Sequence, residues 1–180
     1  MLPYILIGVA VVIIAFVVLV AMRPAEFCIE RSAEIGATPE GVFAIINDLH
    51  AWEKWSPWEK LDRNMKKTFT GPEAGPGAGM AWAGNKKAGE GRISIVESKP
   101  AEFVAMKLEM LSPFPATNQV RFTLTPSGGG TRVTWTMIGH NGFMGKAFSM
   151  VCNLDKMVGK DFEEGLANLN QVAQGVGVSG

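Results

Sequence analysis

The sequence predicts an α+β fold in which a curved antiparallel sheet wraps around a long C-terminal helix, preceded by one transmembrane helix. Three observations support this fold class. The chain begins with a long stretch without charge, four segments between residues 91 and 137 alternate apolar with polar side chains, and residues 153–174 repeat apolar side chains at helical spacing. The chain has 180 residues, which suits one domain of ordinary size beyond such an anchor.

The charge-free stretch runs from Leu2 to Met22. A helix of this length, at about 1.5 Å per residue, spans roughly the 30 Å of a hydrocarbon layer. Arg23 and Pro24 then end it at the interface. The alternative is a cleaved signal peptide, which has a basic start and small residues at its cleavage site. No Lys or Arg precedes the apolar run, and Ala-Met-Arg at its end is a poor cleavage site, so the sequence favours an uncleaved anchor.

We therefore divide the chain into a membrane anchor, residues 1–23, and one domain, residues 24–180, with the bilayer surrounding residues 2–22. Arg23 and Arg31 follow the helix, whereas only the α-amino group precedes it. The positive-inside rule then favours a cytoplasmic domain by a small margin. The sequence predicts a single-pass protein of a bacterial inner membrane and leaves the side of the domain open.

The first part of the domain predicts a strand, a short helix and an aromatic segment. Residues 26–35 alternate as a strand does. Thr38 is placed to cap a helix that has Pro39 in its first turn. Residues 52–58 hold three tryptophans and a proline, which predicts a short helix or turn, and the Gly- and Pro-rich residues 71–79 predict a loop.

Four further strands can be sorted into faces by parity, because successive side chains of a strand point to opposite sides. Their polar positions share one face, which we expect to be exposed to water. The dry face holds Ile93, Ile95, Val104, Met106, Leu108, Met110, Val120, Phe122, Leu124, Val133, Trp135 and Met137. The sheet has to curl to bury this face, and the long C-terminal helix is the element able to cover it.

The C-terminal helix is predicted from about Asn153 to Gln174, with a continuous apolar stripe. Gly159 and Gly165 interrupt it, and each weakens a helix by roughly 1 kcal/mol relative to alanine. We therefore expect something to pack closely against both glycines.

Three motifs, in this order, carry a family resemblance. They are Thr-Pro-Glu-x-Val-Phe at 38–43, Trp-x-x-Trp-Ser-Pro-Trp at 52–58 and Asp-Lys-Met-Val-Gly-Lys-Asp-Phe-Glu at 155–163. With the order of elements, they resemble the SRPBCC/START-like superfamily over residues 26–174, and most closely its polyketide cyclase/dehydrase-like branch. The resemblance implies the helix-grip fold with a deep apolar cavity for lipids, sterols, polyketides or quinones. Only some members are catalysts, and an N-terminal membrane anchor is not general among them.

Tryptophan and methionine are the candidate ligand-binding residues. Indole rings form pocket walls with an occasional polar contact, and thioether chains adapt to irregular apolar shapes. The alternative is that the same residues only fill a solid core. The predicted cavity lining is Trp52, Trp55, Trp58, Met80, Trp82, Met106, Leu108, Met110, Phe122, Trp135, Met137, Met157 and Phe162.

Catalytic residues are not predicted. The dry strand faces between Ile93 and Met137 carry no Asp, Glu, His, Lys, Ser or Cys, although acid–base or nucleophilic chemistry needs such a group in the pocket. His50 and His140 are expected to be solvated. Asn118, beside a Pro-rich turn, is either a polar contact at the cavity rim or an ordinary loop residue.

Other classes of ligand are disfavoured. Lys plus Arg balance Asp plus Glu at 17 each, and the basic residues are scattered, which disfavours nucleic-acid binding. Cys28 and Cys152 lie far apart without metal-ligand spacing. They could form one disulfide, but we expect two small, partly buried thiols. We predict no metal and no cofactor.

Three hypotheses about function remain open. The first is membrane-tethered binding of a hydrophobic small molecule of the lipid, quinone or isoprenoid class, which the apolar dry face favours. The second is an enzyme of polyketide cyclase or dehydratase type, in which a few rim groups suffice. The third is a protein-interaction or co-chaperone-like domain, for which an exposed apolar patch would be the sign. The sequence names neither the ligand nor a protein partner.

Overall fold

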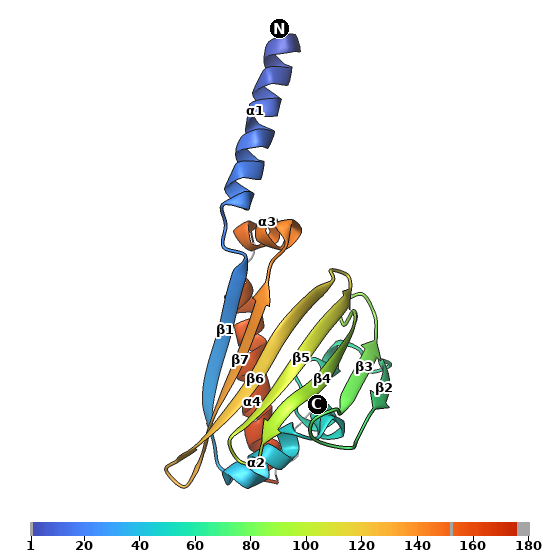
Figure 1. Ribbon diagram of the computed structural model, residues 1–180, viewed down its shortest axis with the longest axis vertical. Coiled ribbons are helices and arrows are strands. Elements are labelled where there is room, and N and C mark those ends of the chain that lie inside the picture. Colours follow the sequence, from blue (N-terminus) through green and yellow to red (C-terminus); the bar gives the residue numbers. More distant parts are fainter. Residues whose placement is uncertain (1, 152, 176–180) are drawn as a thin grey trace.

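The computed structural model describes residues 2–151 and 153–175 (Figure 1). A helix comes first, and a curved sheet with helices on one side follows it. The elements are α1 Leu2–Ala21, β1 Glu26–Ile35, α2 Pro39–Ile46, η1 Leu49–Lys54, η2 Glu59–Leu61, β2 Lys66–Thr70, β3 Gly79–Ala83, β4 Glu90–Lys99, β5 Phe103–Ser112, β6 Ala116–Ser127, β7 Gly130–His140, α3 Phe143–Val151 and α4 Leu154–Ala173.

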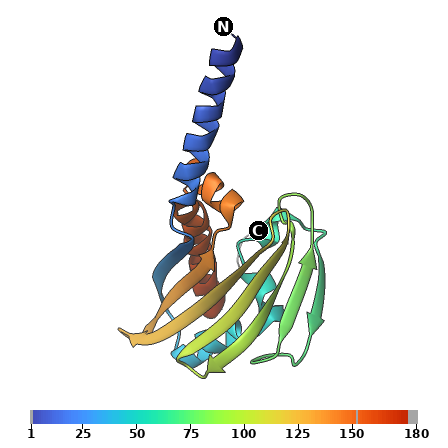
Figure 2. The same cartoon turned by 45° about the horizontal axis from the view of Figure 1, so that its top comes forward.

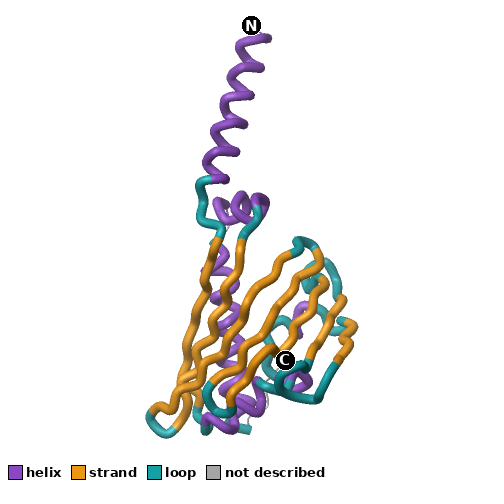
Figure 3. Tube along the Cα trace, in the orientation of Figure 1, coloured by secondary structure: helices purple, strands orange, loops and turns teal. Residues whose placement is uncertain are grey.

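Within the described residues, one antiparallel sheet of seven strands has the order β1-β7-β6-β5-β4-β3-β2. The strands curve together around α4, as the tube trace shows (Figures 2 and 3). The predicted α+β helix-grip architecture is therefore confirmed. The elements that were not predicted include β2 and α3. β2 is a short, polar edge strand with weak alternation, and α3 is a short helix before α4.

One end of the sheet lies next to α1, and we call it the anchor end. The register defines it, because Glu26 at the start of β1 pairs with His140 at the end of β7. On the neighbouring strands Met110 pairs with Ala116, so the β5–β6 turn lies at the same end (Figure 1). α3 and the first turn of α4 also lie there.

Both glycines of α4 allow a close approach, as the sequence predicted. A Cβ on Gly165 would lie 2.8 Å from the Trp135 ring and 3.1 Å from Pro57. A Cβ on Gly159 would lie 2.1 Å from Nη2 of Arg31. These contacts bring α4 close to the sheet, which offsets the low helix propensity of glycine.

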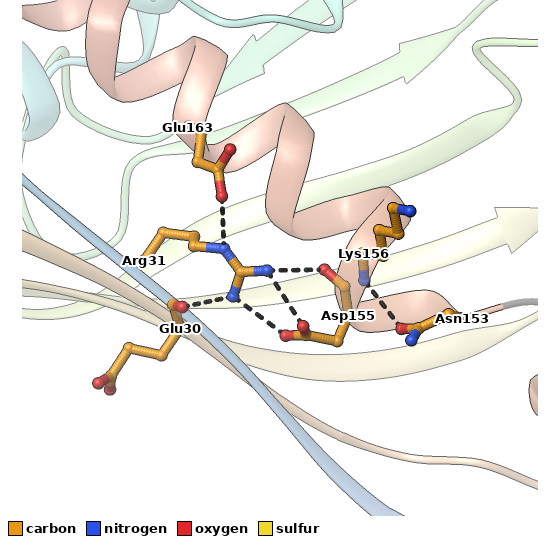
Figure 4. A network of polar contacts seen from close by, with 6 residues as sticks. All are labelled: Glu30, Arg31, Asn153, Asp155, Lys156 and Glu163. Atoms are coloured by element: carbon orange, nitrogen blue, oxygen red, sulfur yellow. Dashed lines mark hydrogen bonds and ion pairs between the residues drawn. The ribbon is translucent and has the colours of Figure 1, made fainter.

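Arg31 of β1 joins the sheet to the start of α4 (Figure 4). Its Nη1 donates to Oδ1 of Asp155 at 3.1 Å, and its Nε donates to Oε1 of Glu163 at 2.8 Å. These hydrogen bonds, the one to Asp155 first, raise the pKa of the guanidinium, and the same contact lowers the pKa of Asp155. Asn153 caps the helix by accepting from the backbone N–H of Lys156 at 2.9 Å.

A second ion pair crosses the outer face of the sheet. Nε of Arg92 donates to Oε2 of Glu109 at 2.7 Å, and the two residues are paired across β4 and β5. This hydrogen bond, followed by that from Lys107, lowers the pKa of Glu109 to about 2. Cys28 is also exposed on the outer face, because its neighbour Ile29 points into the core; its predicted partial burial is wrong. Cys152 lies outside the described residues.

α1 extends away from the domain, and almost none of it is covered by other parts of the chain (Figure 1). Its segment Tyr4–Ala21 has a mean hydropathy of 3.2 and is long and apolar enough to cross a membrane. α1 contacts α3, and Nζ of Lys146 donates to the Ala21 carbonyl at 3.3 Å.

Candidate ligand-binding cavity

A cavity of about 480 Å³ lies between the inner face of the sheet, α4 and the segment 56–65. The sheet supplies one wall because its parity directs apolar side chains inward, and α4 supplies the facing wall. Its lining residues are Phe27, Ile29, Trp52, Ser56, Trp58, Glu59, Leu61, Met65, Met80, Trp82, Lys87, Ala88, Ile93, Leu108, Met110, Ala116, Asn118, Val120, Trp135, Met137, His140, Asn141, Leu154, Met157, Val158, Asp161 and Phe162.

Most of the predicted lining residues lie on this cavity. They are Trp52, Trp58, Met80, Trp82, Leu108, Met110, Trp135, Met137, Met157 and Phe162. These residues lie on the strands, on α4 and in the segment 52–58. Parity and helical spacing indicate which side of each element is apolar, and the curvature of the sheet brings these sides together. That they bind a ligand stays a prediction.

Trp55, Met106 and Phe122 do not line the cavity. Each is at most 1% exposed and belongs to the solid part of the core. Met106 pairs with Ile95 and Val120, one step further from the anchor end than Leu108. Parity places residues on a face but does not say where along a strand packing ends and the void begins.

An aromatic cluster forms the floor of the cavity. The rings of Trp135 and Phe162 stack with centroids 4.1 Å apart and 6° between their planes. Trp58 meets Trp135 edge-on at 5.6 Å, and Trp55 does so at 5.7 Å. Stacked and edge-on aromatic pairs each contribute about 0.5–1.5 kcal/mol beyond their buried area. This cluster makes one end of the cavity rigid and apolar.

Two buried polar atoms on the wall lack a hydrogen-bond partner among the described residues. They are Oδ1 of Asn118 and Nε1 of Trp135. By contrast, Nε1 of Trp52 donates to the Ile46 carbonyl at 3.0 Å. A Cβ on Gly139 would lie 2.1 Å from Oδ1 of Asn118, so this glycine makes room for the amide. A buried polar group without a partner costs about 1–3 kcal/mol, which a ligand group can recover.

Asn118 was identified by sequence only as a possible rim contact. Its parity with Val120 and Phe122 gives the missing signal, because all three point to the dry face of β6. Ser56, Glu59, Leu61 and Met65 were not predicted, because their segment has no regular pattern that places it over the sheet. Phe27 was missed although it shares the parity of buried Ile29 in the strand predicted at 26–35.

The cavity opens at the anchor end. Its exposed lining residues are Lys87 in the β3–β4 turn, His140 at the end of β7 and Met157 near the start of α4. Asp161 lies one turn further along α4 and is half-buried. His140 is exposed, as predicted, although it borders the mouth; His50 stacks on Phe69 with centroids 3.9 Å apart. Within residues 2–151 and 153–175, no group of three His, Cys, Asp or Glu side chains is placed to hold a metal ion.

Comparison with known proteins places this geometry in a family. A family model described as polyketide cyclase / dehydrase and lipid transport matches residues 26–174. No match to a curated protein sequence was found. The similar solved structures share a low sequence identity with this chain, so they show that it has the same fold.

Three of the similar structures illustrate that likeness. A solution structure from Thermobifida fusca has a TM-score of 0.61 at 21% identity, covering 81% of this chain and 92% of that one. A protein from Chromobacterium violaceum has a TM-score of 0.60 at 16% identity, covering 82% and 96%. The Aha1 dimer from Colwellia psychrerythraea has a TM-score of 0.54 at 16% identity, covering 82% and 96%.

Proposed function

The chain belongs to the family of polyketide cyclases, dehydrases and lipid-transport proteins, and on this premise we propose that it binds a hydrophobic small molecule while α1 holds it in a membrane. The observation that carries the proposal is the apolar cavity of about 480 Å³ that opens at the anchor end. Pockets for small molecules have volumes of roughly 300–1,000 Å³ and mostly apolar walls with a few polar groups.

The walls favour a lipid, quinone or isoprenoid, with an apolar body and one polar end. The apolar body would pack on the rigid floor formed by Trp135 and Phe162. The polar end of the ligand would donate a hydrogen bond to Oδ1 of Asn118. This oxygen lies nearer the mouth than the floor does, because Asn118 pairs with Gly139 close to the end of β7. A hydroxyl or amide on the ligand suits that oxygen.

In this proposal residues 1–23 anchor the chain in the membrane and residues 24–180 form the ligand-binding domain. Arg23 and Arg31 favour the cytoplasmic face of a bacterial inner membrane. Exposed Cys28 lies five residues after Arg23 and reports the side directly. In a Cys152→Ser background, a membrane-impermeant maleimide should label Cys28 only after the inner membrane is opened; labelling in intact spheroplasts would reverse the orientation.

A reaction of cyclase or dehydratase type is the second candidate. It is favoured by His140 and Asp161, the ionisable groups at the mouth on β7 and α4. Under this alternative, His140→Gln would abolish conversion of a bound polyketide-like chain while leaving its binding unchanged.

The test of the main proposal uses the full chain in lipid nanodiscs. Bound molecules are extracted and identified by mass spectrometry, and uptake of dansyl-undecanoic acid is titrated against empty nanodiscs. We expect saturable uptake in a one-to-one ratio and an apolar molecule that is absent from the empty discs. Uptake equal to that of empty discs, with no such molecule, would refute ligand binding.

A further inference from the structure

α3 packs against the end of the anchor nearest the domain, and the sequence did not predict this helix. It runs across the end of α1 nearest the domain rather than along it (Figure 1), and Lys146 contacts the Ala21 carbonyl. Phe143, Met144 and Phe148 are 47%, 68% and 46% exposed. At helical spacing these three residues share one side of α3.

A second exposed apolar element lies at the same end of the domain. The β5–β6 turn contains Phe114, which is 68% exposed, and Leu111 near the end of β5 is 53% exposed. Pro113 and Pro115 flank Phe114, so the turn has few backbone donors to satisfy. Both views show this turn and α3 at the end of the sheet from which α1 extends (Figures 1 and 2).

The short connection between α1 and β1 limits what can cover these side chains. α1 ends at Ala21 and β1 begins at Glu26, so only residues 22–25 separate them. A fully extended segment of this length reaches about 14 Å. Once α1 spans a bilayer, this connection keeps the start of β1 within about 14 Å of the end of α1, and so keeps the anchor end of the domain near the same bilayer.

The geometry points to a docking surface for that bilayer, formed by α3 and the β5–β6 turn, which holds the cavity mouth against the lipid. This inference rests on the membrane tether of the proposed function. An amphipathic helix that lies flat in the interface, perpendicular to a spanning helix, is a stable arrangement in lipid. The mouth residues His140 and Met157 lie at the same anchor end as these two elements. A ligand could then pass from the bilayer into the cavity without crossing water.

Basic residues near this surface fit an anionic lipid headgroup. Lys86 and Lys87 are exposed in the β3–β4 turn, and Arg23 is exposed at the end of α1. Glu26 and Glu90 are the exposed acidic residues at the same strand ends. Attraction to a negative surface adds roughly 1 kcal/mol for each nearby Lys or Arg in general, so docking should strengthen with phosphatidylglycerol content.

The test places single nitroxide labels on the full chain in nanodiscs of phosphatidylcholine and phosphatidylglycerol. In a Cys28→Ser, Cys152→Ser background, the labels are introduced by Phe114→Cys, Phe148→Cys and, as a control at the far end, Ser127→Cys. We expect the labels at 114 and 148 to collide with oxygen and not with a water-soluble nickel chelate, and the label at 127 to show the reverse. Equal access of nickel to all three labels would overturn the inference. Low access of both reagents at 114 and 148 would also overturn it, because protein rather than lipid would then cover the surface.

A functional readout separates this inference from the proposed function. Phe114→Ser with Phe148→Ser should slow transfer of dansyl-undecanoic acid from vesicles at least about tenfold, because each change removes an apolar side chain from lipid. Saturating uptake at equilibrium should not change, since neither residue lines the cavity. Docked labels without any uptake would refute ligand binding alone; undocked labels with normal uptake would refute docking alone.

Discussion

Leu108 and Met106 offer a matched test of whether the cavity is a ligand site. They are two residues apart on the same face of β5. Leu108 lines the cavity together with its partners Ile93 and Asn118. Met106 does not line it, although its partner Val120 does, and is 1% exposed. Leucine and methionine side chains have equal numbers of heavy atoms, so tryptophan adds the same bulk at either position.

The structure gives different costs for the two substitutions. Met106→Trp overpacks a filled core, which costs about 1–3 kcal/mol. For a domain of this size, each kcal/mol lowers Tm by roughly 2–4 °C, so we expect a fall of about 2–12 °C. Leu108→Trp extends into a void of about 480 Å³, where the added ring finds space and apolar contacts. Its Tm should stay within about 3 °C of that of the wild type, since less than 1 kcal/mol is at stake.

The assay measures both quantities on the full chain in nanodiscs. Thermal unfolding is followed by near-ultraviolet circular dichroism, and binding by the emission shift of dansyl-undecanoic acid. Leu108→Trp should raise the Kd of the probe at least about tenfold, because the ring occupies the space that an apolar chain would fill. Equal destabilisation by both substitutions would show that no void exists beside Leu108. Wild-type affinity in a stable Leu108→Trp variant would show that the probe binds elsewhere.

Three further outcomes are expected. Gly165→Ala should destabilise the domain by about 1–3 kcal/mol in chemical denaturation, because its Cβ meets the rigid rings of Trp135 and Pro57; a gain in stability would contradict this packing. Glu109 has a lowered pKa, so its contribution to the free energy of unfolding is present above its ordinary pKa of 4.5 and is lost as the pH falls to about 2. Glu109→Gln should therefore make the free energy of unfolding depend less on pH over that range, and an unchanged pH dependence would exclude the contribution. Deleting residues 1–23 should give a folded chain that carbonate releases from membranes while the full chain stays; an unfolded or retained product would show that the boundary is misplaced.

The fold could be predicted largely because its periodicities are strong. Ile93, Val120 and Val133 alternate with polar neighbours and are buried as parity requires. Gly159 and Gly165 predicted close packing because glycine is unfavourable inside a helix, and the structure has a close contact at each of them. α3 escaped prediction because its apolar residues Phe143, Met144 and Phe148 face away from the core, so no buried stripe marked it as a helix.

The cavity was harder to predict than the fold, because a void has no sequence pattern of its own. Trp55 and Trp58 belong to one motif, yet one fills the core and the other lines the cavity. The difference depends on how a segment without regular structure crosses the sheet. Asn118 shows the opposite case: its parity was readable, but its burial depended on the space that Gly139 leaves on the next strand.

The cavity stays open because α4 is held at a fixed height above the sheet along its length. Arg31, which pairs with Trp135 across β1 and β7, connects the sheet to Asp155 at the start of α4 and to Glu163 one residue after Phe162. In the middle, Phe162 lies flat on Trp135, and neither ring can yield without losing the stacking contact. At the far end the side chain of Asn170 accepts the backbone N–H of Gly36 at 2.9 Å. Collapse onto the void would require breaking at least one of these contacts. The proposed ligand would therefore enter a preformed space, and no free energy of binding would be needed to open it.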